Sequence, residues 1–260
     1  MNQRWEEGRP RWRSDRETIN PSEYDIEEMP GKDRRAMEFV ETHHYSRSYP
    51  SGRFSFALRR HGRLVGVAVF SHPTNNLTLT KSFPCDALEA VELGRLVLLD
   101  EVPGNGESWF VARCFKGLSS HHIRGVVSFS DPMPRRAADG TVLTPGHRGC
   151  VYQSLNAVYT GRGTARTLRM FSDGTVLNDR TIQKIRKQER GWEGAVRTLQ
   201  AYGAGDLDRP PAEWVRAWVP QLTRAVPHRG NHKYLWAIDR RLRESLPRSM
   251  PYPKEIDAAV

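Results

Sequence analysis

The order of hydrophobic and polar positions predicts strands that alternate with helices through the middle of the chain. Residues 54–60 alternate apolar and polar side chains, residues 64–70 are continuously apolar, and the His-Gly pair between them is typical of a hairpin turn. Residues 91–102 and 125–131 are predicted to form two further buried strands. Strands that alternate with helices in this way indicate a mixed α/β sheet.

Three segments between and after these strands have helical patterns. Apolar residues at 110, 111, 114, 115 and 118 mark one face of an amphipathic helix, which places the Cys114 side chain in the core. Residues 152–161 are predicted to form a short helix closed by Gly161, and residues 179–189 a basic one.

The same pattern divides the chain into three parts. Residues 1–30 mix Arg, Glu, Pro and Trp without a period, and we expect an irregular arm there. Residues 31–178 contain the alternating elements and are predicted to form the core. Residues 179–260 are predicted to form a basic helical extension, from which a late strand at 231–239 returns to the core sheet.

Composition narrows the environment and the partners. The 260 residues carry a formal net charge of +10, which favours an anionic partner such as nucleic acid, although a basic protein without such a partner stays open. The three cysteines are widely spaced and form no CxxC pair, so a zinc ribbon and a disulfide scaffold are both disfavoured. No run of about 18 apolar residues is present, so we expect a cytoplasmic protein that does not enter the membrane.

The turn at 103–108, "PGNGES", joins a predicted strand to a predicted helix. Gly104 and Gly106 permit close approach of a ligand, and Ser108 is expected at the N-cap, so the free N–H groups of the helix would suit a pyrophosphate. The turn lacks the GK[ST] of a P-loop and the third glycine of a Rossmann fingerprint. A plain capped turn therefore remains the alternative.

Six separated blocks give the chain a family resemblance. "HHYSRSYPSG", "LVGVAVFSHP", "ELGRLVLLDEVPGNGESWFVARCFKGL", "VVSFSDP", "HRGCVYQSLNAVYTG" and "HKYLWAID" together resemble the bacteriophage Mom family, in order and with compatible spacing. Members of that family modify adenine in DNA by carbamoylmethylation on a scaffold like that of the GNAT acyl-CoA N-acyltransferases. The resemblance implies an α/β fold with a mostly antiparallel central sheet flanked by helices.

The resemblance also implies a site. It links His44, Tyr45, Asp131 and Tyr152 to a bound iron and to activity, and it assigns Arg95 and Ser108 to acetyl-CoA. We expect the rest of the turn, Gly104, Asn105, Gly106 and Glu107, to hold the same donor. A histidine, a carboxylate and two phenols form a ligand set that suits iron. The segment 133–146 is longer than the corresponding link of the family, which bears on how Asp131 and Tyr152 are placed.

Each of these residues also has a structural explanation that the sequence leaves open. His44 could simply end a helix, Tyr45 and Tyr152 could pack in the core, and Asp131 could be a turn residue before Pro132. Arg95 lies within an aliphatic strand and could pair with a nearby acid.

Double-stranded DNA is the expected partner, and its phosphates would be contacted by Arg148, Arg180, Lys184 and Lys187. The last three share a helical face, which could equally be a solvated surface. Two other functions stay open: an ordinary GNAT acyltransferase acting on RNA, protein or a small amine, and a DNA-binding protein without catalysis. A donor other than acetyl-CoA, such as an aminoacyl group, and a homodimer also stay open.

Overall fold

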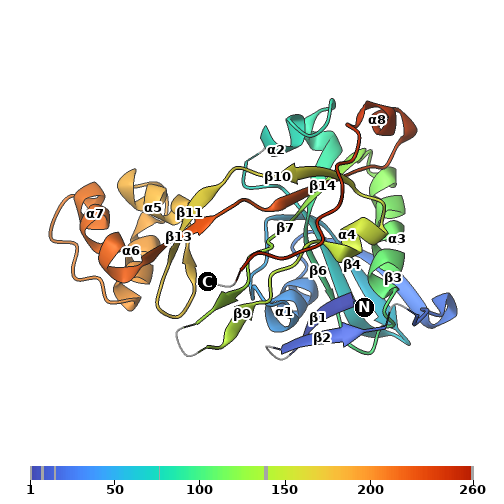
Figure 1. Cartoon of the computed structure of the whole chain (residues 1–260), viewed down its shortest axis with the longest axis horizontal. Helices are drawn as coiled ribbons and strands as arrows, with labels where there is room; N and C mark the ends of the chain where they lie inside the picture. Colours follow the sequence, from blue (N-terminus) through green and yellow to red (C-terminus); the bar gives the residue numbers. More distant parts are fainter. Residues whose placement is uncertain (1, 7–8, 15, 76, 138–139, 259–260) are drawn as a thin grey trace.

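The two apolar hairpin strands lie in the interior of one large sheet (Figure 1). The computed structural model describes residues 2–6, 9–14, 16–75, 77–137 and 140–258. Within these residues the central sheet has seven strands, in the spatial order β10 (Val158–Arg162), β14 (His232–Ala237), β7 (Gly125–Ser130), β6 (Ala90–Leu98), β5 (Arg63–Ser71), β4 (Gly52–Arg60) and β3 (Tyr24–Pro30).

The sheet opens between its two parallel strands. β6 and β7 pair in parallel from Ala90 to Glu92 of β6, opposite Gly125 to Val127 of β7, whereas the other neighbouring strands pair antiparallel. Within the described chain this pairing ends at Glu92, although both strands continue beyond it. The predicted mixed, mostly antiparallel sheet is thus confirmed, and a gap opens between its two halves.

Helices cover both faces of this sheet. α3 (Gly106–Ser120) buries Phe110, Val111, Cys114 and Leu118 in the largest core cluster, so the predicted amphipathic face is confirmed. On the other face, α1 (Arg34–His43) packs Ala36, Phe39 and Val40 against β3 to β6. The remaining short helical elements of the core are η1 (Pro21–Glu23), α2 (Leu77–Thr80), η2 (Ala87–Glu89), α4 (Cys150–Ser154) and α8 (Arg240–Ser245).

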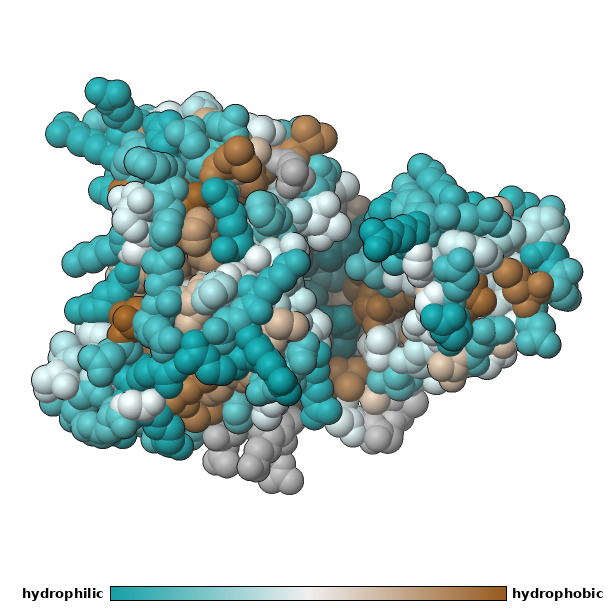
Figure 2. Space-filling model, turned by 180° about the vertical axis from the view of Figure 1, so that it is seen from behind, coloured by the Kyte–Doolittle hydropathy of each residue, from teal (hydrophilic) through white to brown (hydrophobic). Residues whose placement is uncertain are grey.

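A second lobe is inserted between β10 and β14 and extends to the left in Figure 1. Figure 2 shows the two lobes from behind, with a hollow between them. A second hydrophobic cluster, centred on Trp214 and Leu199, forms the interior of this lobe. The lobe consists of β11 (Arg166–Met170), β12 (Val176–Leu177), α5 (Asp179–Arg186), α6 (Trp192–Ala201), α7 (Pro211–Leu222) and β13 (Arg224–His228).

The long link at 133–146 folds back on itself and keeps its two ends together. It contains the short hairpin of β8 (Arg135–Arg136) and β9 (Val142–Thr144), and Met133 packs against β11 and β13 of the second lobe. The backbone amide of His147 donates to the carbonyl of Asp131 at 2.8 Å. The extra length therefore does not separate Asp131 from the residues that follow the link.

The structure differs from our predictions in three places. The described part of residues 1–30 is not irregular throughout: β1 (Asn2–Glu6) and β2 (Arg9–Arg13) form a hairpin, and β3 is an edge strand of the central sheet. The helix predicted over 152–161 ends at Ser154, since Val158–Arg162 pairs with β14 as an edge strand. The second lobe begins at β11, before residue 179. For β3, β10 and β11, backbone pairing with another strand far along the chain overrides the local pattern, whereas β1 and β2 form a local hairpin. No helix in the described residues is both long enough and apolar enough to span a bilayer.

Trp214 allows a test of the separate interior of the second lobe. Its side chain is fully buried, and its indole N–H donates to the carbonyl of Asp206 at 2.9 Å. We expect Trp214→Ala to lower the free energy of unfolding of this lobe by about 3–5 kcal/mol, because the substitution leaves a large cavity. Hydrogen exchange of α5 to α7 measures the loss. Leu207, which is 37% exposed, gives the matched control: Leu207→Ala should change the free energy of unfolding of the lobe by less than about 0.5 kcal/mol. Equal hydrogen-exchange protection in the two variants would contradict this packing.

Candidate functional site

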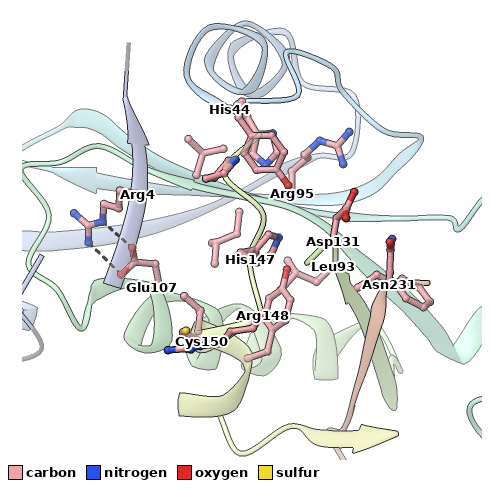
Figure 3. A pocket seen from close by; sticks show the side chains of 18 of the residues that line it. Arg4, His44, Leu93, Arg95, Glu107, Asp131, His147, Arg148, Cys150 and Asn231 are labelled. Carbon is pink, nitrogen blue, oxygen red and sulfur yellow. Dashed lines mark hydrogen bonds and ion pairs between the residues drawn. The ribbon is translucent and has the colours of Figure 1, made fainter. Parts of the chain in front are cut away.

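A cavity of about 830 Å³ opens where β6 and β7 diverge (Figure 3). Its walls are β6 from Glu92 onward, the end of β7, the loop after α1, and residues 147–152 at the start of α4. All four residues that the resemblance linked to activity line it: His44, Tyr45, Asp131 and Tyr152. Residues far apart in the sequence therefore meet in one concave site.

His44 is placed by the end of α1. It is the C-cap of that helix, its amide donates to the carbonyl of Val40, and its ring lies 4.2 Å from that of Tyr45. Its Nδ1 accepts the amide hydrogen of Ser46 at 3.1 Å. Burial, together with the positive charge of Arg95, lowers the pKa of His44 to about 3. The ring is thus neutral near pH 7, and its hydrogen lies on Nε2.

Arg95 holds the loop that carries His44. Its Nε donates to the carbonyl of Ser48 and its Nη2 to the hydroxyl of the same residue, both at 2.9 Å, and its Nη1 donates to the carbonyl of Gly94 at 2.6 Å. The guanidinium thus connects β6 to the α1–β4 loop. The pairing with a nearby acid that the sequence left open is replaced by these bonds, whereas the assignment to acetyl-CoA stays a prediction.

His147 lies between the two tyrosines of the site. Its ring centroid is 6.4 Å from that of Tyr45 and 6.3 Å from that of Tyr152, in edge-to-face arrangements. Burial lowers the pKa of His147, raises the pKa of Tyr45, and raises that of Tyr152 to about 12. Both phenols are therefore protonated near pH 7. The three rings together form an aromatic wall beside the polar groups.

Asp131 is held from three directions. Its Oδ1 accepts from the amide of Met133 and contacts Nε2 of His228, both at 3.0 Å, and its Oδ2 lies 3.5 Å from Nη2 of Arg135. His228 is the last residue of β13 in the second lobe. The carboxylate that follows β7 is thus oriented partly by a residue of the other lobe.

These groups, as arranged, do not form an iron site. His44 uses its Nδ1 lone pair for the amide of Ser46, which leaves Nε2 with its hydrogen, and Oδ1 of Asp131 has two partners, whereas Oδ2 has only the 3.5 Å contact with Arg135. Among the described residues no group of three or more His, Cys, Asp or Glu side chains is placed to hold a metal ion. The residues that the resemblance implied converge, but a metal at Nε2 of His44 would require the ring hydrogen to move to Nδ1 and the bond from the Ser46 amide to be lost.

Glu92 lines the cavity at the last paired position of β6 and was not among the predicted site residues. Burial raises the pKa of its carboxyl group, and the charge of Arg95 acts in the opposite direction. A raised pKa brings a carboxyl group closer to the range in which it can exchange protons near neutral pH. An acid within an otherwise apolar strand was the sequence signal that could have identified it.

The N-terminal hairpin and the segment that follows it cover the turn at 103–108. The amide of Gly104 donates to the carboxylate of Glu17 at 3.1 Å, and Asn105 Oδ1 accepts from the amide of Ile19 at 2.7 Å. Glu107 forms a buried ion pair of 2.7 Å with Arg4. The N–H group expected to face a pyrophosphate is bonded to a carboxylate of the same chain.

The N-cap prediction for Ser108 is wrong. α3 begins at Gly106 with Asn105 as N-cap, so Ser108 is the third helical residue, and its hydroxyl donates to the carbonyl of Asn105 at 3.0 Å. The helix starts earlier because residues 103–106 already form its first backbone bond, from the amide of Gly106 to the carbonyl of Pro103 at 2.8 Å.

The four predicted phosphate contacts do not lie together. Arg148 lines the cavity and donates to the carbonyl of Lys254 in the C-terminal tail. The others belong to the second lobe: Arg180 is ion-paired with Glu189 at 2.5 Å, Lys184 is half-buried, and Lys187 is the exposed C-cap of α5. Their role in binding DNA stays a prediction.

The lowered pKa of His44 predicts a specific dependence on pH. An unfolded histidine titrates near pH 6.5, whereas folded His44 titrates near 3. The unfolded chain therefore binds this proton first, so the contribution of His44 to stability is complete above about pH 6.5 and is lost as the pH falls toward 3. NMR titration of the ring should show a neutral His44 at pH 5. Between pH 6.5 and 4 the His44→Gln variant should lose less stability than the native protein. Titration of His44 near pH 6.5 would contradict the geometry.

Comparison with known proteins identifies a family and several structures with a similar fold. None of the curated proteins compared with the chain matches it. Solved structures similar to it include an N-acetyltransferase from Staphylococcus aureus Mu50 (12% identity, TM-score 0.38, 83% of this chain and 99% of that chain). A Bacillus subtilis acetyltransferase in complex with CoA (8%, 0.36, 82% and 98%) and a tandem GNAT protein from the clavulanic acid biosynthesis pathway (9%, 0.42, 84% and 99%) are also similar. These TM-scores are too low to support an argument about function.

The family comparison covers the site itself. The model of the Mom protein family matches residues 23–254, a range that includes β3 to β14 and the walls of the cavity from His43 to Lys254. Because this match spans most of the sequence, the chain belongs to the Mom protein family.

Proposed function

We propose that this protein is a transferase that modifies the exocyclic amine of adenine in DNA within the cavity between β6 and β7. The observation that supports this most directly is that His44, Tyr45, Asp131 and Tyr152 line one cavity in a member of the Mom family. A volume of about 830 Å³ lies within the usual range of small-ligand pockets and can accommodate a nucleoside.

Adenine inside a duplex is stacked and paired, so the enzyme must turn the target nucleotide out of the helix. That step costs a few kcal/mol, which contacts from Lys and Arg to the phosphates offset. The ring wall formed by Tyr45, His147 and Tyr152 offers the aromatic contact that an extrahelical base prefers. Arg148, at the cavity, is the predicted phosphate contact nearest to such a base.

The reaction requires removal of a proton from the adenine amine, which is a weak nucleophile because its lone pair is delocalised into the ring. Glu92, with its raised pKa, is our candidate base for this proton. Tyr152 is protonated near pH 7 and is a candidate hydrogen-bond donor to the oxygen of the transferred group.

The product distinguishes two reactions at this site. Transfer of an acetyl group from acetyl-CoA forms a bond from the amine to the carbonyl carbon and releases the thiolate. A carbamoylmethyl product instead requires a bond from the amine to a CH₂ carbon, and therefore a donor with a leaving group on that carbon. For the acetyl product we propose acetyl-CoA as the donor, and for the carbamoylmethyl product a related donor that carries a leaving group on the CH₂ carbon. Either donor would be held near the turn at 104–108, and the mass of the product decides between the two.

Mass spectrometry of nucleosides from plasmid DNA tests the proposal. Plasmid from cells expressing the protein should contain modified deoxyadenosine, and Glu92→Gln should lower its amount by about 10²-fold or more because the base is lost. Lys116→Ala, on the exposed face of α3, is the matched control and should leave the amount unchanged. Unmodified plasmid from well-folded protein would contradict the proposal, and an acetyl product would indicate ordinary acyl transfer.

The donor proposal makes a separate prediction about the covered turn. A CoA diphosphate at Gly104 must displace the Glu17 carboxylate, which occupies the same amide and repels phosphate. Glu17→Ala should therefore bind CoA several-fold more tightly than the native chain in isothermal titration calorimetry. Asp25→Ala removes an exposed acid on β3 and should have no effect. Equal affinities for Glu17→Ala and the native protein, or no binding by either, would exclude this turn as the donor site.

A further inference from the structure

We propose that His228 is a positioning residue that orients the Asp131 carboxylate toward the cavity and thereby connects the second lobe to the reaction. The inference rests on the proposed function only for the role of Asp131 in the site; the contact itself is tested independently below. His228 was not among the residues that the sequence identified.

The hydrogen-bond pattern assigns the ring hydrogen of His228. The amide of Gly230 donates to Nδ1 at 3.0 Å, so Nδ1 must carry a lone pair. The hydrogen of the neutral ring is therefore on Nε2, which lies 3.0 Å from Oδ1 of Asp131 and donates to it. The His228 side chain has no exposed surface, whereas that of Asp131 is 20% exposed. A buried ring with a fixed tautomer thus holds a carboxylate that reaches the cavity.

Asp131 needs such a partner because the sheet does not fix it. The pairing of β7 with β14 ends at Ser130, opposite His232, so Asp131 is the first residue beyond the paired strand. The amide of Met133 fixes one side of the carboxylate at 3.0 Å, and the contact with Arg135, at 3.5 Å, is long. His228 supplies the second short contact, which limits rotation of the carboxylate about its side-chain torsions.

The contact also joins two parts of the fold. β13, which ends at His228, pairs along its length with β11, and it follows directly from α7 of the second lobe. After Gly230 the chain enters β14 of the central sheet, and Asn231 lines the cavity. A shift of the second lobe, for example when it contacts a large substrate, would therefore reach Asp131 directly through this ring, in addition to the packing of Met133 on β11 and β13.

Two substitutions distinguish the role of Nε2 of His228 from that of Nδ1. Gln places an amide nitrogen near the position of Nε2 and can still donate to Asp131, whereas Asn places an amide oxygen near Nδ1 and retains only the bond from Gly230. We expect His228→Gln to modify plasmid adenine within a few-fold of the native protein. His228→Asn should be slower on the order of 10–100-fold, mainly in kcat, by analogy with the loss of other orienting partners. Equal rates for the two variants would overturn the positioning role.

An NMR measurement on the native protein tests the hydrogen bond between His228 and Asp131 without an activity assay. The Nε2 hydrogen of His228 should exchange slowly with solvent and be visible in spectra of the histidine rings, and Asp131→Ala should make it exchange faster. Absence of this hydrogen signal in the native protein, or no change in Asp131→Ala, would overturn the contact. If the signal is present but the native protein leaves DNA unmodified, the proposed function fails and the contact stands.

Discussion

The end of parallel pairing between β6 and β7 at Glu92 is the constraint on which the rest of the site depends. Beyond this residue the two strands cannot share backbone hydrogen bonds across the gap, and the space between them is filled by side chains and loops rather than by a further strand. β6 presents Glu92 and Arg95 to one side of the gap, and Asp131 follows β7 on the other. The cavity is thus a consequence of sheet topology, as is usual for ligand sites of α/β sheets.

Segments outside the sheet then close and orient this opening. The N-terminal hairpin covers the turn before α3 through Arg4, and the C-terminal tail is fixed by two bonds of 2.7 Å between Arg162 and Asp257. Met133, just before the hairpin of β8 and β9, packs on the second lobe, and the last strand of that lobe places His228 next to Asp131. Polar groups at the site are therefore held by contacts between residues that are far apart in the sequence. These contacts give the cavity a defined arrangement before any ligand binds.

The sequence predicted much of the core because its signals are local. The periodicity of Phe110, Val111, Cys114 and Leu118 identified the buried face of α3, and the resemblance identified four residues that now line one cavity. Residues whose role depends on long-range contacts were missed. His228 contacts Asp131 across 97 positions, and no local pattern marks His228 as its partner. The edge strand at Val158–Arg162 looked helical because its pairing with β14 cannot be seen in its own residues.

The most direct test of this account is a crystal structure of the protein bound to a short DNA duplex that contains adenine. The account predicts an adenine turned out of the duplex into the cavity, with its exocyclic amine near Glu92 and its ring against the wall formed by Tyr45, His147 and Tyr152. A complex in which every base remains stacked, or in which the DNA lies away from the opening between β6 and β7, would contradict it.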